Sequence, residues 1–266
     1  MFALRQPPPE RLEISGHSYR RALVFKHDFF AATCLYELES NSREVLPKLV
    51  VKFGREQPFC GLPLSWLGQW NRDHEEAIYA RIAGIPGVPR WGGRVGSCGF
   101  AIEYIDGLPL DHFERPPERF FDGLREIFDA LHARGVAYGD ANKRSNILVG
   151  PGGRPYLIDY QLALRTRDDL PLLGLALRTA VRYLCRKDLY HLYKHKRRLA
   201  PAELTPEEEA LSRDRGGLHL LHRKLTKPYR ALRRRFLHKQ YQKGQLVSPT
   251  AKMEDHRQPE KETWRT

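Results

Sequence analysis

AYGDANKRSNILV (Ala137–Val149) and YLIDYQ (Tyr156–Gln161) are the stretches that decide the fold of this chain. Each contains a short apolar run, and the glycine- and proline-rich turn between them predicts two short strands of a hairpin. The two stretches also contribute Asp140, Asn146 and Asp159, two carboxylates and one amide. The sequence therefore brings several oxygen donors to the ends of short strands.

These three side chains suit phosphoryl transfer. That reaction needs a carboxylate to orient the attacking hydroxyl, and oxygen ligands to hold Mg²⁺ against the phosphates. We predict Asp140 as the catalytic base. Asn146 and Asp159 are the predicted metal ligands, because Mg²⁺ prefers hard oxygen donors.

In both stretches the sequence resembles the protein-kinase-like superfamily. Asp140 to Asn146 resembles the catalytic loop H-R-D-x-x-x-x-N, and the Asp159-Tyr160-Gln161 segment stands in the place of D-F-G. The loop is one residue longer than the family pattern, which implies a bulge. It is open whether Asn142 or Lys143 takes the position that faces the phosphates. Lys143 is our second predicted catalytic residue.

The N-terminal half holds further matches in the family's order. Lys52 in LVVKF resembles the strand lysine that contacts the nucleotide phosphates, and Glu75 resembles the helix glutamate that orients this lysine. Glu76 is a close competitor of Glu75. The IEYI segment resembles the hinge, so Glu103 and Ile105 are predicted to bind adenine through their backbone. The resemblance implies ATP and Mg²⁺ as cofactors.

The chain also departs from regulated protein kinases. No G-x-G-x-x-G occurs between the first two predicted strands, where Lys26–Thr33 reads KHDFFAAT. Tyr138 and Gly139 replace the histidine and arginine before the catalytic aspartate, so a phosphorylated activation loop has no arginine to bind. The interval from Asp159 to Asp169 is too short for a long activation segment, and no A-P-E follows.

This reduced layout is most similar to the Kdo/WaaP lipopolysaccharide-core kinases, among the small atypical kinases. The GVPR and IEYIDGLPL stretches and the basic C-terminal region carry this likeness. It implies a membrane-associated, cytoplasmic enzyme at the inner face of a membrane, which phosphorylates a sugar hydroxyl of a glycolipid. Two alternatives stay open: a small atypical Ser/Thr protein kinase, and a pseudokinase scaffold that binds partners without catalysis.

The predicted class is α+β, with the two lobes of a protein-kinase-like fold: an antiparallel sheet with one helix, followed by a mostly helical lobe. The predicted parts are an N-terminal extension (1–20), an N-lobe (21–105), a C-lobe with basic helices (106–241) and a disordered tail (242–266). Apolar periodicity predicts helices over 65–83, 117–135 and 168–186, and strands over 21–38, 49–53, 100–105, 146–149 and 156–158.

Charge is distributed unevenly along the chain. The formal net charge is +13, and Arg215–Met253 contains no Asp or Glu. Such a basic segment attracts phosphate, anionic lipid or nucleic acid. An anionic membrane surface and a glycolipid or other hydroxyl-bearing substrate are the partners we predict, with nucleic acid as the less favoured alternative. No apolar run is long enough to predict a membrane span.

Cysteine and histidine patterns predict no metal site. The four cysteines lie far apart without a C-x-x-C pair, which favours a reducing compartment. His191 and His195 are four residues apart, but no H-E-x-x-H pattern accompanies them. A solvated basic helix face is the favoured interpretation of these two histidines.

Overall fold

The described part of the chain forms two compact units. The first comprises described residues up to 73 together with 91–104, and the second comprises 74–90 and 105–214. One boundary falls between Tyr104 and Ile105, within the predicted hinge. The structure is a computed structural model that describes residues 3–4, 6–27, 31–40, 45–58, 65–167, 169 and 171–214.

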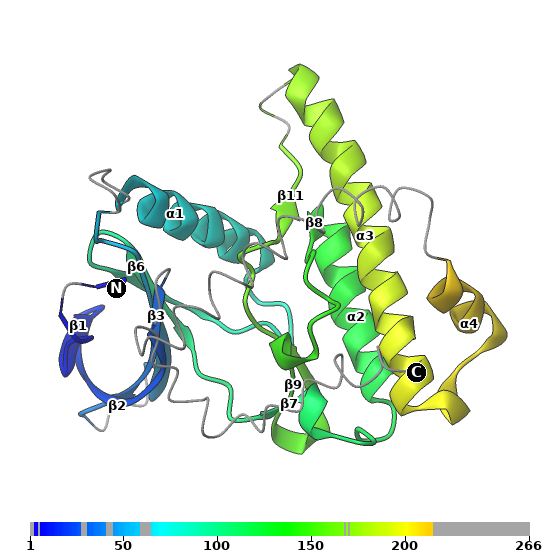
Figure 1. Ribbon diagram of the computed structural model, residues 1–266, viewed down its shortest axis with the longest axis horizontal. Coiled ribbons are helices and arrows are strands. Elements are labelled where there is room, and N and C mark those ends of the chain that lie inside the picture. The colour runs from blue at the N-terminus through cyan, green and yellow to red at the C-terminus, as the bar shows by residue number, and fades with distance from the viewer. Residues whose placement is uncertain are drawn as a thin grey trace. The chain divides into compact units, whose positions relative to one another are not determined.

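A curled antiparallel sheet forms the first unit (Figure 1). Its spatial order is β1-β2-β3-β4-β6-β5, and the two edge strands β1 and β5 contact each other. The Ser15 hydroxyl donates to the Gly92 carbonyl, 3.5 Å away, across this closure. Tyr19, Tyr36 and Val51 are buried inside the curl. The strands are β1 (Arg11–Ile14), β2 (His17–His27), β3 (Ala31–Leu38), β4 (Lys48–Gly54), β5 (Trp91–Val95) and β6 (Gly99–Glu103).

The predicted N-terminal extension, residues 1–20, needs correction, because it contains β1 and the start of β2. These strands pair through a tight turn in which Ser15 has φ 51° and Gly16 has φ 79°. A two-residue hairpin turn with positive φ at both positions matches the right-handed twist of the strands. The Ser-Gly dipeptide was the sequence signal for this hairpin.

Helix α1 (Ser65–Ile82) agrees with the predicted helix over 65–83. The boundary between the units lies within it, after Asp73. Its second half buries Ile78, Tyr79 and Ile82. Gly84, at φ 78°, follows the helix in the left-handed conformation that commonly ends helices.

Helices dominate the second unit. Apolar residues at three- and four-residue steps bury one face of α2, which confirms the predicted amphipathic helix over 117–135. Two small antiparallel sheets, β10-β9-β7 and β11-β8, accompany the helices, so the predicted α+β class is confirmed. The elements are β7 (Leu108–Pro109), α2 (Phe120–Ala133), β8 (Val136–Ala137), β9 (Ile147–Val149), β10 (Pro155–Leu157), β11 (Leu164–Arg165), α3 (Pro171–Leu199) and α4 (Pro206–Arg213), with short 3₁₀ turns at Leu110–His112, Arg144–Asn146, Pro151–Gly153 and Pro201–Glu203.

Helix α3 runs well beyond the predicted end near Arg186, to Leu199. The additional turns are rich in Lys, Arg and His, and two of these side chains, His195 and Lys196, are buried beside apolar residues such as Leu192 and Tyr193. These buried polar residues interrupt the apolar periodicity on which the prediction rests. Of the two predicted capping residues, Asp168 lies outside the described residues. Asp169 forms a 2.6 Å ion pair with Arg167 before the helix begins.

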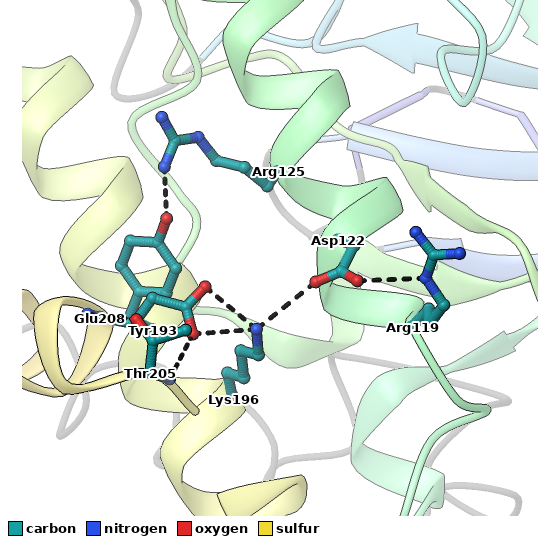
Figure 2. A network of polar contacts seen from close by, with 7 residues as sticks. All are labelled: Arg119, Asp122, Arg125, Tyr193, Lys196, Thr205 and Glu208. Carbon is teal, nitrogen blue, oxygen red and sulfur yellow. Dashed lines mark hydrogen bonds and ion pairs between the residues drawn. The ribbon is translucent and has the colours of Figure 1, made fainter. Parts of the chain in front are cut away.

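Lys196 joins three helices of the second unit (Figure 2). This α3 side chain is 4% exposed, and its ammonium lies 3.4 Å from Asp122 of α2 and 2.9 Å from Glu208 of α4. Glu208 also completes a capping box with Thr205 at the start of α4. Arg125 donates to the Tyr193 hydroxyl beside them. A shared cation therefore fixes α4 to α2 and α3.

Several predictions concern residues outside the described part: the loop at 28–30, the basic helices after 214 and the tail over 242–266. Among the helices that are described, none combines the length and the hydropathy that crossing a bilayer requires.

Candidate active site

The catalytic loop consists of two consecutive turns closed by a side-chain hydrogen bond. The Lys143 amide donates to the Asp140 carbonyl at 3.0 Å, and the Asn146 amide donates to the Lys143 carbonyl at 3.1 Å. The Asn146 side-chain amide then donates to the Asp140 carboxylate at 2.9 Å. Two turns take up the additional residue of the loop and still bring Asp140 and Asn146 together.

Gly139 occupies a position that only glycine fits. Its φ is 78°, and a Cβ built there would lie 2.7 Å from the Leu162 carbonyl oxygen. An arginine at this position would therefore require the backbone at 162 to move. The neighbouring Tyr138 donates its hydroxyl hydrogen to the Ile158 carbonyl at 2.5 Å, which ties the loop to the residue before Asp159.

Asp159 lies near Asp140 and has a strained backbone. Its φ of 65° is uncommon for a residue with a side chain, and such strain concentrates at functional sites. Burial raises the pKa of Asp140; the ammonium of Lys143 opposes this shift, and the charge of Asp159 adds to it. A raised pKa strengthens a carboxylate as a general base.

Aromatic rings pack behind this site in the second unit. Tyr160, which follows Asp159, has ring-centroid distances of 5.2 Å to both Tyr79 of α1 and Tyr138. Phe128 of α2 lies 6.1 Å from Tyr138. All four rings are buried, so they hold the Asp159 segment and the catalytic loop in one packed layer.

Asp188 is a buried residue in contact with the predicted catalytic loop, and the sequence reasoning missed it. It is 1% exposed on α3, and its carboxylate accepts from the amides of Tyr138 at 2.8 Å and Gly139 at 2.9 Å. His132 contacts the same carboxylate at 3.2 Å. Burial raises the pKa of Asp188, and these three hydrogen bonds oppose the shift. A signal existed, since Asp188 is the single acidic residue in the sequence of α3.

The predicted solvated face at His195 is wrong. His195 is buried, and its Nε2 lies 3.0 Å from the Ala141 carbonyl. Burial lowers the pKa of His195 to about 3, so the ring is neutral and Nε2–H donates to that carbonyl. The preceding Lys194 donates to Asn142 Oδ1 at 2.8 Å. Because Asn142 is held by Lys194, Lys143 is the better candidate to face the phosphates.

Two predicted nucleotide-binding residues belong to the first unit. Lys52 lies on β4, opposite Phe100 of β6, and its ammonium is 5.6 Å from the centre of that ring. Glu103 ends β6 opposite Leu49. Just after Glu103, the Tyr104 amide donates to the Lys48 carbonyl at 3.1 Å, which extends the β4–β6 pairing toward the predicted hinge.

The other predicted residues belong to the second unit. Glu75 is 1% exposed, whereas Glu76 is partly exposed, which favours Glu75 for an internal role. The charges of Glu75 and Asp159 both add to the rise that burial causes in the pKa of Tyr79, so both carboxylates lie within electrostatic reach of this tyrosine. Ile105 is buried where the second unit resumes after the hinge.

The oxygen donors of the second unit fit a hard divalent cation. Asn146 Nδ2 donates a hydrogen bond to the Asp140 carboxylate, so the Oδ1 atom of Asn146 can coordinate a cation. Asp140 and Asp159 repel each other electrostatically, and a cation between them would relieve this repulsion. Nowhere in the described part do three or more His, Cys, Asp and Glu side chains gather as a metal site, so water and phosphate oxygens would complete the coordination, as is usual for Mg²⁺.

Comparisons with known proteins show no family for this chain. No protein-family model and no curated protein match this sequence. Among solved structures, the BubR1 kinase domain aligns over 74% of this chain and 67% of its own, with 15% identity and a TM-score of 0.48. A likeness of this size assigns no chemistry. The curled antiparallel sheet, helix α1 and the mostly helical second unit follow one another in the order of a protein-kinase-like fold.

Proposed function

We propose that this protein is an ATP- and Mg²⁺-dependent phosphotransferase. One observation carries the proposal: Asp140 and Asn146 are hydrogen-bonded across the catalytic loop, with the strained Asp159 close enough to shift the pKa of Asp140. Shifted pKa values and strained backbone both concentrate at functional sites, and here the two occur beside a shared set of oxygen donors.

Each residue has a proposed role. Asp140 orients the acceptor hydroxyl and takes its proton, and the raised pKa of Asp140 suits this task. Asn146 Oδ1 and the Asp159 carboxylate would hold Mg²⁺, while Lys143 and Lys52 contribute positive charge toward the phosphates. Glu103 and Ile105 are proposed to bind adenine through their backbone, and Glu75 to orient Lys52. When bound, Mg²⁺-ATP supplies the phosphoryl group.

The proposed acceptor is a sugar hydroxyl of a lipopolysaccharide-core-type glycolipid. The likeness to the Kdo/WaaP group supports this acceptor, and so does the short connection from Asp159 to α3, which leaves no room for a peptide-docking activation segment. The proposal implies an enzyme that works in the cytoplasm, at the inner face of a membrane. A small atypical protein kinase and a non-catalytic scaffold are the competing functions.

Substrate class can be decided by one labelling experiment. Purified protein is incubated with labelled ATP and Mg²⁺, beside either fractionated cell-envelope glycolipids or a protein extract. The glycolipid fraction is expected to gain phosphate. Label in the protein fraction alone would establish the protein kinase instead, and failure to bind Mg²⁺-ATP would favour the scaffold.

Asp140→Asn and Asp159→Asn should both abolish efficient turnover, by different routes. Loss of the base should leave nucleotide binding intact and lower the rate by about 10² to 10⁴. Loss of the metal ligand should weaken Mg²⁺-dependent ATP binding itself. Calorimetric titration with ATP separates the two effects. Asp129→Asn is the control, since Asp129 is an exposed residue of α2 paired with Arg125; wild-type behaviour in both active-site variants would refute the assignment.

A further inference from the structure

Helix α3 holds the predicted catalytic loop at its first turn. Its first turn runs from Asp140 to Lys143, so Ala141 and Asn142 are the central residues of that turn. His195 binds the carbonyl of the first, and Lys194 binds the side chain of the second. Two consecutive residues of one helix therefore hold both central residues of the turn.

The hydrogen bonds from His195 and Lys194 to the first turn both have features that make hydrogen bonds strong. Ala141 and His195 are both buried, so the Ala141 carbonyl has little access to water and depends on a protein donor. The neutral ring of His195 supplies that donor without a buried charge. The Lys194 contact, at 2.8 Å, is a hydrogen bond from an ionised donor, and such bonds are the stronger kind.

The same helix also holds the residues just before the turn. Asp188 accepts from the amides of Tyr138 and Gly139. His195 follows Asp188 by seven residues, about two helical turns, so the two side chains leave α3 on one face. Asp188 therefore fixes the entry to the loop, and the Lys194–His195 pair fixes its first turn.

We propose that Lys194 and His195 are positioning residues for the reaction: they hold the first turn of the loop against α3, so that the Asp140 carboxylate keeps its place beside Asn146. A longer loop has more backbone freedom and needs more restraint to present one geometry. Neither residue touches the reacting atoms. The kinetic part of this inference rests on the proposed phosphotransferase function, whereas the tether itself does not.

Two removing variants and two conservative variants test the proposal. Lys194→Met and His195→Leu delete the donors, whereas Lys194→Arg and His195→Gln keep a donor at each position. Small displacements of reacting groups can cost about 10²-fold in rate. We therefore expect kcat to fall about 10- to 100-fold in the removing variants, with KM for ATP nearly unchanged, and most of kcat to return in the conservative ones. Arg182→Met, at an exposed position of α3, is the matched control and should behave as wild type.

A double variant distinguishes positioning from general damage. Lys194→Met combined with Asn142→Ala should be no slower than Lys194→Met alone, because both changes break one contact. Additive losses would contradict the proposal. So would an unchanged kcat in both removing variants, or a loss that the conservative variants fail to restore.

Amide hydrogen exchange gives a second measurement that needs no turnover. Peptides covering 138–146 should exchange faster in Lys194→Met and His195→Leu than in wild type or Arg182→Met. If wild type transfers no phosphate, the proposed function fails, and exchange alone still decides the tether. Unchanged exchange in the removing variants would overturn the inference, whatever the activity.

Discussion

Two tyrosine hydroxyls of the packed layer behind the site differ in their partners. Tyr138 donates to the Ile158 carbonyl, whereas the buried Tyr160 hydroxyl has no hydrogen-bond partner among the described residues. Leaving a buried polar group unpaired costs about 1–3 kcal/mol. Tyr160→Phe should therefore be neutral or raise the free energy of unfolding by about 1 kcal/mol, and Tyr138→Phe should lower it by about 1–2 kcal/mol. Urea denaturation of both variants measures this, and equal effects would contradict the assigned partners.

His195 should make the folding stability of the protein depend on pH. The pKa of this ring is lowered from 6.5 to about 3 in the fold, because burial disfavours the charged form. As pH falls below 6.5, the unfolded chain takes up a proton that the folded chain refuses. Stability is therefore lost through this group between those two values, by at most about 1.4 kcal/mol per pH unit.

The His195→Gln variant tests this response. It should lose less stability than wild type when denaturation is compared at pH 7 and pH 4, because glutamine does not titrate. All other groups are common to the two proteins, so the difference between their slopes reports on His195. Parallel pH profiles would mean that His195 takes up its proton as readily in the folded chain as in the unfolded chain, and would contradict the lowered pKa.

At the scale of elements, the ion pairs of Lys196 with Asp122 and Glu208 (Figure 2) should stabilise the position of α4. Lys196→Met leaves Asp122 and Glu208 without their shared cation and should cost about 1–3 kcal/mol. Hydrogen exchange should accelerate in α4 more than in α2. Arg213→Met is the control, since this 68% exposed side chain pairs only with Glu209 of its own helix among the described residues and should cost under about 0.5 kcal/mol.

Some elements could be predicted from sequence and others could not. Helix α2 has a regular apolar face, and its predicted extent agrees with the structure. The far half of α3 has a less clear pattern, because it buries Asp188, His195 and Lys196 among its apolar residues. Buried polar side chains are satisfied by partners far along the chain, and a periodicity argument does not see such partners.

The candidate site shows the same division. Asp140, Asn146 and Asp159 follow a linear motif, and they lie together in the second unit. Asp188 and the Lys194–His195 pair contact the loop from about 50 residues away and belong to no local motif. Sequence could therefore predict that these three residues lie close together, but it could not predict which residues hold them in place. Their catalytic roles stay predictions until the variants are measured.

At the scale of the whole molecule, the basic segment after residue 214 should bring the protein to an anionic membrane. It lies outside the described residues, so the prediction rests on its charge. Each cation near such a surface contributes about 1 kcal/mol. Replacing Arg233, Arg234 and Arg235 with Ser should reduce sedimentation with anionic vesicles, and added salt should reduce it in the wild type.

The control variant replaces three other exposed arginines, which lie in the described part of the chain. Arg11, Arg20 and Arg119 have side chains that are 67%, 66% and 81% exposed. Replacing these with Ser changes the net charge equally and should leave vesicle binding nearly intact. Equal losses in both triple variants would mean that net charge alone attracts the protein. Binding to neutral vesicles would contradict the electrostatic proposal.

The lack of space between Gly139 and the Leu162 carbonyl also limits how this chain could evolve. An arginine-based phosphorylation switch is not one substitution away, because any side chain at 139 collides with backbone before it can serve a new purpose. A descendant would first have to relocate the segment at 162, which gives no benefit by itself. The packing at Gly139 thus makes the gain of an arginine at this position depend on an earlier change in the backbone at 162.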